Sequence, residues 1–313
     1  MIFAFVLSSI GKTDLCSDVH VRRVAFSVCL IGIHESISAG DAPFTQQQDL
    51  VIADAASASP CRWTSSLPPA PKRPRDCGRR QRAWHSDRGK IRDHRYGQFY
   101  DIFCGRGYCV FAVRPGSIDR FDAADMVANI ETAIRWVKEH AGTYGIDPAQ
   151  VGLTGASAGG HLASLTGLKT SRSAEDPARV AAVGVFFPPT DLLDYGGVKA
   201  DPRGDTRIGK IAARLGFASG TTGLTDEQVD EKLALISPAR QVHAGAPPFL
   251  LIHGDADPAV PLKQSEVLRD NLKAADVPVE LIVKPGGGHP WSTIHEEVAK
   301  LADWFDQRLL PAK

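Results

Sequence analysis

From residue 107 onward, short apolar runs alternate with longer amphipathic stretches, and this alternation restricts the fold more than any other feature of the chain. Residues 108–113 form an apolar run typical of a buried parallel strand. Residues 121–144 place apolar side chains at helical spacing, and Gly145 with Asp147-Pro148 forms a stop signal. Strands that alternate with helices predict an α/β fold with a mostly parallel central sheet and helices on both faces. Further strands are expected at 151–154, 180–187, 248–253 and 277–283, and further helices at 157–168, 262–275 and 294–309.

One stretch, at about residues 191–236, breaks this alternation. It contains glycine-rich loops and segments long enough only for short helices. An insertion between two strands of a parallel sheet emerges above the strand ends. We therefore expect residues 191–236 to form a small cap over that edge.

The most informative short motif is Gly155-Ala156-Ser157-Ala158-Gly159, which follows an expected strand and opens an expected helix. A serine at such a sharp turn has a strained backbone and needs small neighbours, because the helix and the adjoining strand approach closely. The turn lifts the Ser157 hydroxyl clear of the sheet, next to a helix N-terminus that favours developing negative charge. The motif predicts a nucleophile at Ser157; the alternative is a glycine-rich helix start without chemistry.

Two later segments supply an acid and a base at strand ends. Asp255 and Asp257 follow the strand at 248–253, and we choose Asp257 because it lies deeper in the turn. Asp255 is expected to cap the turn backbone, and the alternative is that both acids only form the turn. His289 follows a glycine run, so its ring could reach Ser157 as a general base. The chain order Ser, Asp, His is the order of an α/β-hydrolase triad.

Two other histidines, His161 and His253, lack this context. We expect His161, on the helix after Ser157, to pack or to line the site as a polar group, and His253 to be structural.

Residues from about 84 to the end resemble an α/β-hydrolase of the esterase/lipase superfamily, close to feruloyl-esterase-like and acetyl-esterase groups. The chain is also similar to the catalytic domain of prolyl-oligopeptidase-type peptidases. The resemblance rests on motifs in the expected order, at 105–117, 153–163, 237–240, 247–257 and 288–289. It implies the α/β-hydrolase fold, with Ser157 as nucleophile, Asp257 as acid and His289 as base.

One element of that family is missing from the sequence. Such enzymes carry a His-Gly-Gly-Xaa-Trp loop after an early apolar strand, and its backbone N–H groups complete the oxyanion hole. This chain has Arg80-Gln81-Arg82-Ala83-Trp84 at that place. The expected oxyanion donors are thus the backbone N–H of Ala158 and an N–H near Ala83. Removing one such donor typically lowers turnover by about 10²–10³.

The segment before this loop is strongly basic. Residues 61–95 hold eleven Lys or Arg against three Asp, with five prolines at 60–74, and we expect 46–83 to be irregular. Three interpretations stay open: a solvated linker, a nucleic-acid patch that lacks aromatic interleaving, or a shifted reading frame over about 51–82. Codons for Asp76–Arg82 can be chosen that, shifted by one base, read Ile-Val-Val-Val-Gly-Asn-Gly. Sequencing of the locus would test the third interpretation.

The first 45 residues predict a possible extension with an export signal. Arg22-Arg23 precede the apolar run 24–33, and small residues follow, which is the order of a secretory signal. The alternative is a short buried helix or strand. We therefore expect a secreted or periplasmic protein; if the segment is not an export signal, we expect a cytoplasmic protein.

Composition narrows the function classes. The chain has 313 residues, 43% of them apolar, and Lys+Arg and Asp+Glu both total 36, so a balanced globular protein is expected rather than a nucleic-acid binder. No apolar run is long enough for a membrane-spanning helix. Six cysteines without a Cys-Xaa-Xaa-Cys spacing speak against a disulfide framework or a zinc ribbon.

The sequence thus predicts a serine hydrolase in residues 84–313 that cleaves small carboxylic esters through an acyl-enzyme, with no cofactor and no metal. Two alternatives stay open: a serine peptidase of prolyl-oligopeptidase type, and a catalytically impaired binding protein on a hydrolase scaffold. Neither the acyl group nor the oligomeric state can be predicted.

Overall fold

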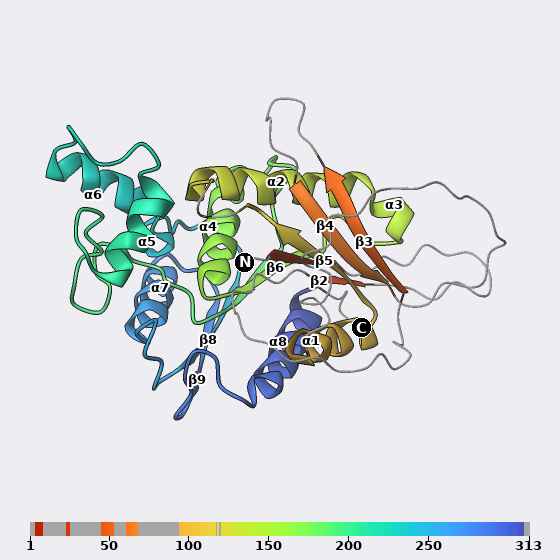
Figure 1. Cartoon of the computed structure of the whole chain (residues 1–313). Coiled ribbons are helices and arrows are strands. Elements are labelled where there is room, and N and C mark those ends of the chain that lie inside the picture. The colour runs from red at the N-terminus through yellow and green to blue at the C-terminus, as the bar shows by residue number, and fades with distance from the viewer. Residues whose placement is uncertain are drawn as a thin grey trace, which may run out of the picture.

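The strands of this chain lie in one sheet, seen in the computed structural model of Figure 1. The structure describes residues 4–8, 23–25, 45–52, 61–67, 94–116, 118 and 120–309. Within these residues the sheet has nine strands in the order β3-β4-β5-β2-β1-β6-β7-β8-β9. Their bounds are β1 Ala4–Ser8, β2 Arg23–Ala25, β3 Thr45–Ile52, β4 Cys61–Leu67, β5 Tyr108–Arg114, β6 Val151–Ala156, β7 Ala182–Phe186, β8 Phe249–Gly254 and β9 Val279–Lys284.

Strands β6 to β9 form the regular half of the sheet. All neighbouring pairs here are parallel, with Leu153 opposite Val183, Val185 opposite Leu251, and Leu251 opposite Leu281. Every residue of β6, β7 and β8 is buried, which explains their continuous apolar runs. Because the four strands are parallel, their carboxyl ends, and the loops that follow, lie at one edge.

Strands β1 to β5 form a mixed half. β2 runs parallel to β5, while β1 is antiparallel to β2, β5 and β6, and β3 and β4 extend the sheet with antiparallel pairs. We expected no regular structure over residues 46–83, and this prediction is wrong at 46–52 and 61–67. The β-favouring residues Trp63 and Thr64 pair with Val113 and Ala112 of β5, so β4 gains a neighbour on each side. The rest of 46–83 lies outside the described residues.

Helices cover both faces of the sheet, as the sequence predicts. Helices α2 and α4 lie on one face and α1 and α8 on the other (Figure 1). Helix α7 packs on β8 and β9. The helix bounds are α1 His94–Gly105, α2 Ala123–Glu139, α3 Ala141–Tyr144, α4 Ala158–Thr170, α5 Arg207–Gly216, α6 Asp226–Leu235, α7 Lys263–Ala274 and α8 Ile294–Leu309, with a short 3₁₀ turn at Pro238–Arg240.

The expected single helix at 121–144 is two helices. Asp122 starts α2 by accepting a hydrogen bond from the Asp125 backbone N–H at 2.9 Å, in a capping box. The helix ends at His140, whose ring contacts the Trp136 carbonyl oxygen at 2.8 Å and stacks on the Trp136 ring. Helix α3 follows and ends at Gly145, which has the left-handed conformation with φ 62°.

The cap residues contribute α5 and α6, which lie at one end of the molecule beside α7 and away from β3 and β4 (Figure 1). Thr206 caps α5 by accepting a hydrogen bond from Gly209, and Thr225 caps α6 from Gln228. Helix α5 presents Ala212 and Leu215 to the protein interior. The cap is thereby fixed over the edge at which the parallel strands end.

The extension with an export signal that was expected in the first 45 residues has little counterpart in the structure, where Ala4–Ser8 and Arg23–Ala25 are strands inside the sheet. The expected export segment lies outside the described residues except for Arg23–Ala25, which form β2. Within the described part of the chain, no helix has the length and apolarity needed to cross a membrane.

Candidate active site

The turn between β6 and α4 carries Ser157 in a strained conformation. Its backbone has φ 56° and ψ −128°, a region that residues other than glycine rarely adopt. The Ser157 N–H donates to the Phe186 carbonyl oxygen at 2.9 Å, which ties the turn to β7. A Cβ at Gly160 would lie 3.1 Å from that same oxygen, so a side chain there would push the turn and the sheet apart by a few tenths of an ångström. The turn presents the Ser157 side chain outward.

Ser157, His289 and Asp257 lie in one hydrogen-bonded line. His289 Nε2 is 2.8 Å from Ser157 Oγ, and His289 Nδ1 is 2.6 Å from Asp257 Oδ2. Since a carboxylate only accepts hydrogen bonds, Nδ1 carries the proton and Nε2 accepts the serine hydroxyl. The structure therefore brings together the three residues selected from the sequence, in the arrangement of a nucleophile, a base and an orienting acid.

The carboxyl group of Asp257 is fully buried and satisfied on both oxygens. Oδ1 accepts the backbone N–H groups of Ala259 and Val260 at 2.8 and 2.9 Å, and Oδ2 faces His289. Burial raises the pKa of Asp257, but the hydrogen bonds from His289, Val260 and Ala259 outweigh it and hold the pKa below its usual value. Asp257 is thus held ionised beside the imidazole.

The neighbouring carboxylate, Asp255, has a different partner. Its Oδ1 accepts the Gly286 backbone N–H at 2.6 Å, so it fastens the loop after β9 rather than its own turn. Two glycines let this loop approach: a Cβ on Gly254 would lie 2.2 Å from the Gly287 carbonyl oxygen. The Ala256 N–H donates to that same oxygen at 3.0 Å. Within the glycine run before His289, Gly287 is required by this close approach, because its own Cβ would lie 2.9 Å from Gly254 Cα.

His253, which the sequence predicted only to be structural, contacts the turn that carries Asp257. It is fully buried, and burial lowers its pKa. Its Nδ1 lies 2.7 Å from the Ser265 hydroxyl, and its Nε2 lies 2.9 Å from the Val260 carbonyl oxygen and 3.6 Å from Asp257 Oδ2. The His253 ring thus holds the turn that carries Asp257 in place.

The residue Phe187 was not singled out from the sequence. Its backbone has φ 35°, and its ring packs on the His289 ring with centroids 4.4 Å apart. Trp291 packs on Phe187 in turn and donates from Nε1 to the buried Glu297 at 2.8 Å. In the sequence, only Trp291, two positions after His289, indicated that aromatic side chains pack beside the histidine.

Of the two expected oxyanion donors, Ala158 lies among the described residues and Ala83 does not. Ala158 is the first residue of α4 and lines the pocket beside Ser157. Ser157 makes no side-chain cap to this helix, so the first N–H groups of α4 are not used by it. Ala83 lies outside the described residues.

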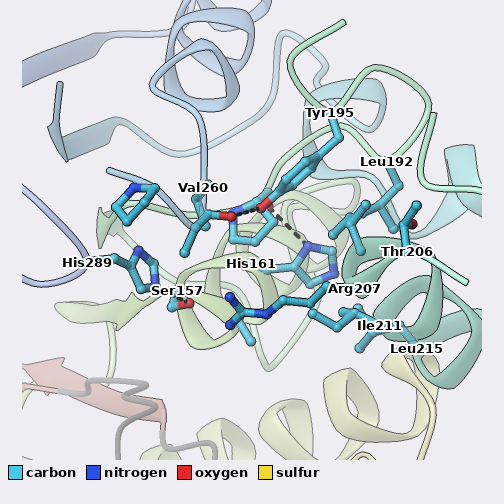
Figure 2. Close-up of a pocket in the computed structure, with 15 residues that line it drawn as sticks. Ser157, His161, Leu192, Tyr195, Thr206, Arg207, Ile211, Leu215, Val260 and His289 are labelled. Carbon is cyan, nitrogen blue, oxygen red and sulfur yellow. Dashed lines mark hydrogen bonds between the residues drawn. The ribbon is translucent and has the colours of Figure 1, made fainter. Parts of the chain in front are cut away.

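A pocket of about 330 Å³ opens between this line of residues and the cap. Its floor includes Ser157, Ala158 and His289, and Figure 2 shows His161, Tyr195 and Arg207 around it. Tyr195 donates its hydroxyl to the Ala259 carbonyl oxygen at 2.8 Å, which ties the cap segment to the acid turn. The cap contributes apolar walls, namely Leu192, Ile208, Ile211 and Leu215.

A serine–histidine–aspartate line at the carboxyl edge of a parallel sheet fits the family suggested by the sequence. The BD-FAE family model matches residues 82–272, which is more than half of the chain. The chain belongs to the BD-FAE family. Its fold is the α/β-hydrolase fold. The matched residues of this BD-FAE protein include Ser157 and Asp257, and His289 lies beyond them.

Named relatives of this BD-FAE protein include esterases. It is 32% identical to the esterase LipQ of Mycobacterium tuberculosis over 149 residues, covering 48% of this chain and 34% of LipQ. It is 29% identical to the probable carboxylic ester hydrolase LipM of the same organism over 155 residues, again 48% of this chain and 34% of the relative. The BD-FAE chain therefore spans about a third of the length of these relatives.

Solved structures similar to this BD-FAE protein carry the same fold. A truncated carbohydrate esterase from gut microbiota superposes with a TM-score of 0.64 at 24% identity, over 87% of this chain and all (100%) of that one. Esterase 2 of Thermogutta terrifontis, in a form phosphonylated by sarin, gives a TM-score of 0.61 at 26% identity, over 85% of this chain and 97% of that one.

Proposed function

We propose that this protein is a carboxylic ester hydrolase that works through Ser157, His289 and Asp257 and a covalent acyl-enzyme. The observation that carries the proposal is the continuous line of hydrogen bonds from Asp257 through His289 to the Ser157 hydroxyl. The esterase relatives support the reaction class. We assign the catalytic unit to residues 84–313, with the cap at about 191–236.

In the acylation step, Ser157 Oγ attacks the ester carbonyl carbon as its proton passes to His289 Nε2. Asp257 stabilises the imidazolium and keeps Nδ1 protonated without taking the proton. The tetrahedral oxyanion accepts a hydrogen bond from the Ala158 backbone N–H, and a second donor is expected near Ala83. The intermediate then collapses, and the alcohol leaves with the proton from His289.

In the deacylation step, water takes the place of the alcohol. His289 Nε2 removes a proton from the water as its oxygen attacks the acyl carbon. Collapse of the second intermediate releases the carboxylic acid and returns the proton to Ser157 Oγ. These steps return Ser157 and His289 to their starting protonation states. The proposal, as expected from the sequence, includes no cofactor and no metal.

The peptidase alternative has one specific point in its favour. The chain is 27% identical over 186 residues to the rat acylamino-acid-releasing enzyme, although it covers only 22% of that protein. Comparing an acetyl-amino-acid p-nitroanilide with the p-nitrophenyl ester of the same acid separates the two activities. We expect the ester to be turned over and the anilide to be left intact.

Hydrolysis of p-nitrophenyl acetate and butyrate, with Ser157→Ala as the control, tests the proposal. We expect turnover by the natural sequence and a loss of at least about 10⁴-fold in kcat in Ser157→Ala. Equal turnover by both proteins would contradict the role of Ser157. If neither protein is active, the same assay on a variant with the frame restored over 51–82 separates an incomplete oxyanion hole from a binding protein.

Export is part of the same proposal. The order of Arg22-Arg23, the apolar run and the small residues supports a secretory signal. N-terminal sequencing of the protein recovered from its native compartment tests it. A new N-terminus just after the small residues at 36–42 supports export and means that the mature sheet forms without β1 and β2, and an uncut chain in the cytoplasm contradicts it.

A further inference from the structure

The pocket contains a single formal charge among the described residues that line it. Most of the wall is formed by four apolar side chains of the cap, together with residues of the loops at the strand ends. Arg207 is the one Lys or Arg of this lining, and no Asp or Glu belongs to it. Arg207 is an exposed residue, and a hydrocarbon chain that entered the pocket would remove water from its guanidinium and gain nothing in return.

Arg207 is placed to meet a substrate. It is the first residue of α5, and Figure 2 shows its side chain extending across the pocket with the guanidinium toward Ser157. The acids nearby on the cap already have partners: Asp205 pairs with Lys210, and Asp226 pairs with Arg203. Arg207 has no hydrogen-bond or ion-pair partner within the part of the chain that the structure describes.

A second polar group of the same pocket, His161, calls for a different kind of partner, a hydrogen-bond donor. This side chain is 1% exposed, and its Nδ1 lies 3.1 Å from the Pro189 carbonyl oxygen, so Nδ1 carries the proton. The other nitrogen, Nε2, is a buried acceptor without a partner among the described residues. Burial lowers the pKa of His161 to about 4, so the ring stays neutral and does not supply positive charge. An unsatisfied buried acceptor is unfavourable unless a donor meets it, so His161 calls for a water or a substrate hydroxyl, and the case for an anionic group rests on Arg207 alone.

We propose that Arg207 recognises a carboxylate on the acyl part of the substrate, so that the enzyme prefers esters of dicarboxylic acids over neutral esters of equal length. The guanidinium would pair with the far carboxylate while Ser157 attacks the ester carbonyl. The N-terminus of α5, from which Arg207 projects, adds a favourable dipole. This inference rests on the proposed esterase function and adds the substrate class to it.

The test compares the mono-p-nitrophenyl ester of adipic acid with p-nitrophenyl heptanoate, which has the same length without the charge. We expect Arg207→Gln to lower the ratio of kcat/KM for the anionic over the neutral ester by about 10–100-fold, mainly through KM. Arg207→Lys should restore part of the ratio, because it keeps the charge but not the fork of donors. Raising the salt concentration should lower the ratio in the natural sequence.

Lys210→Gln is the matched control, since it removes a cation from the same helix that is 62% exposed and paired with Asp205. We expect it to leave both rates unchanged. An unchanged ratio in Arg207→Gln, or an equal fall in Lys210→Gln, would overturn the inference while leaving the esterase function standing.

A binding measurement keeps the inference testable if neither ester is hydrolysed, a result that counts against the proposed function and is followed up with the frame-restored variant. Calorimetric titration of Ser157→Ala with adipate should then show binding that Arg207→Gln weakens by about 10–100-fold. Equal adipate affinity with and without Arg207→Gln would overturn the inference.

Discussion

The loops at the strand ends and the cap meet at one pocket, but they are held in different ways. At the strand ends the key side chains are buried and fixed: Asp257 accepts three hydrogen bonds, and His253 is satisfied on both ring nitrogens. On the cap, some charged side chains pair on the outer surface, as Arg203 does with Asp226, whereas Arg207 has no such partner among the described residues. The difference indicates that the strand ends set the chemistry and the cap sets which substrate fits.

The largest expected effect is on kcat, and it distinguishes two carboxylates that follow the same strand, Asp257 and Asp255. We expect Asp257→Asn to lower kcat by about 10⁴-fold, because an amide no longer stabilises the imidazolium or holds the tautomer that accepts the Ser157 proton. Asp255→Asn, which weakens one bond to the Gly286 N–H, should change kcat by less than about tenfold. Steady-state kinetics on a p-nitrophenyl ester measures both. Similar losses in the two variants would show that Asp257 has no special role.

The next effect concerns stability at low pH. The pKa of His161 is lowered by burial to about 4, whereas the unfolded chain takes up this proton near pH 6.5. The unfolded state therefore binds more protons between pH 6.5 and 4, and His161 lowers the free energy of unfolding by up to about 3 kcal/mol as the pH falls through this range.

Denaturant unfolding at pH 7 and pH 4.5 measures this effect, with His161→Gln as the comparison. We expect the natural sequence to lose more stability on acidification than His161→Gln, in which only His253 and the other groups still titrate. Equal losses would mean that His161 is not buried in its neutral form.

A third effect tests the contact that joins the two loops. In Gly254→Ala the new Cβ would lie 2.2 Å from the Gly287 carbonyl oxygen, so the His289 loop must move. We expect kcat/KM to fall by about 10²-fold, because a displacement of about 1 Å at the base is enough for such a loss. Gly142→Ala is the control, since its Cβ would meet nothing within 4 Å. If both variants keep full activity, the close contact does not position His289.

The smallest effect comes from the apolar wall of the cap. Ile211→Ala enlarges the pocket without touching the triad. We expect KM for p-nitrophenyl octanoate to rise by up to about tenfold while kcat changes little, because less apolar surface is buried on binding. The acetate ester, which is too short to reach this wall, serves as the control substrate. A large fall in kcat for acetate would contradict the separation between chemistry and fit.

The regular half of the sheet follows from the sequence because local and global preferences agree there. The strands β6 to β8 are buried and mostly apolar, β9 is apolar except at Glu280 and Lys284, and the helices that follow β6 and β8 were expected from the sequence. The order of Ser157, Asp257 and His289 then places their side chains at one edge, and the structure brings them together. The choice between Asp255 and Asp257 needed only their depth in the turn.

The other half could not be predicted in the same way. The strands β3 and β4 hold polar runs such as Thr45–Asp49, and they gain regular structure by pairing with β5 and with each other, which no local pattern shows. Arg207 could not be recognised from the sequence either, because an arginine in the first turn of an amphipathic helix looks like any solvated residue until the pocket beside it is known. The supporting roles of Phe187 and His253 depend equally on contacts between distant segments.

The measurement that tests the central claim most directly is covalent labelling with a fluorophosphonate, followed by intact-mass analysis and peptide mapping. We expect one adduct per chain, located on Ser157, and a much slower reaction in His289→Ala, where no base accepts the serine proton. Labelling of another residue, or ester turnover by a chain whose Ser157 stays unlabelled, would show that this serine is not the nucleophile.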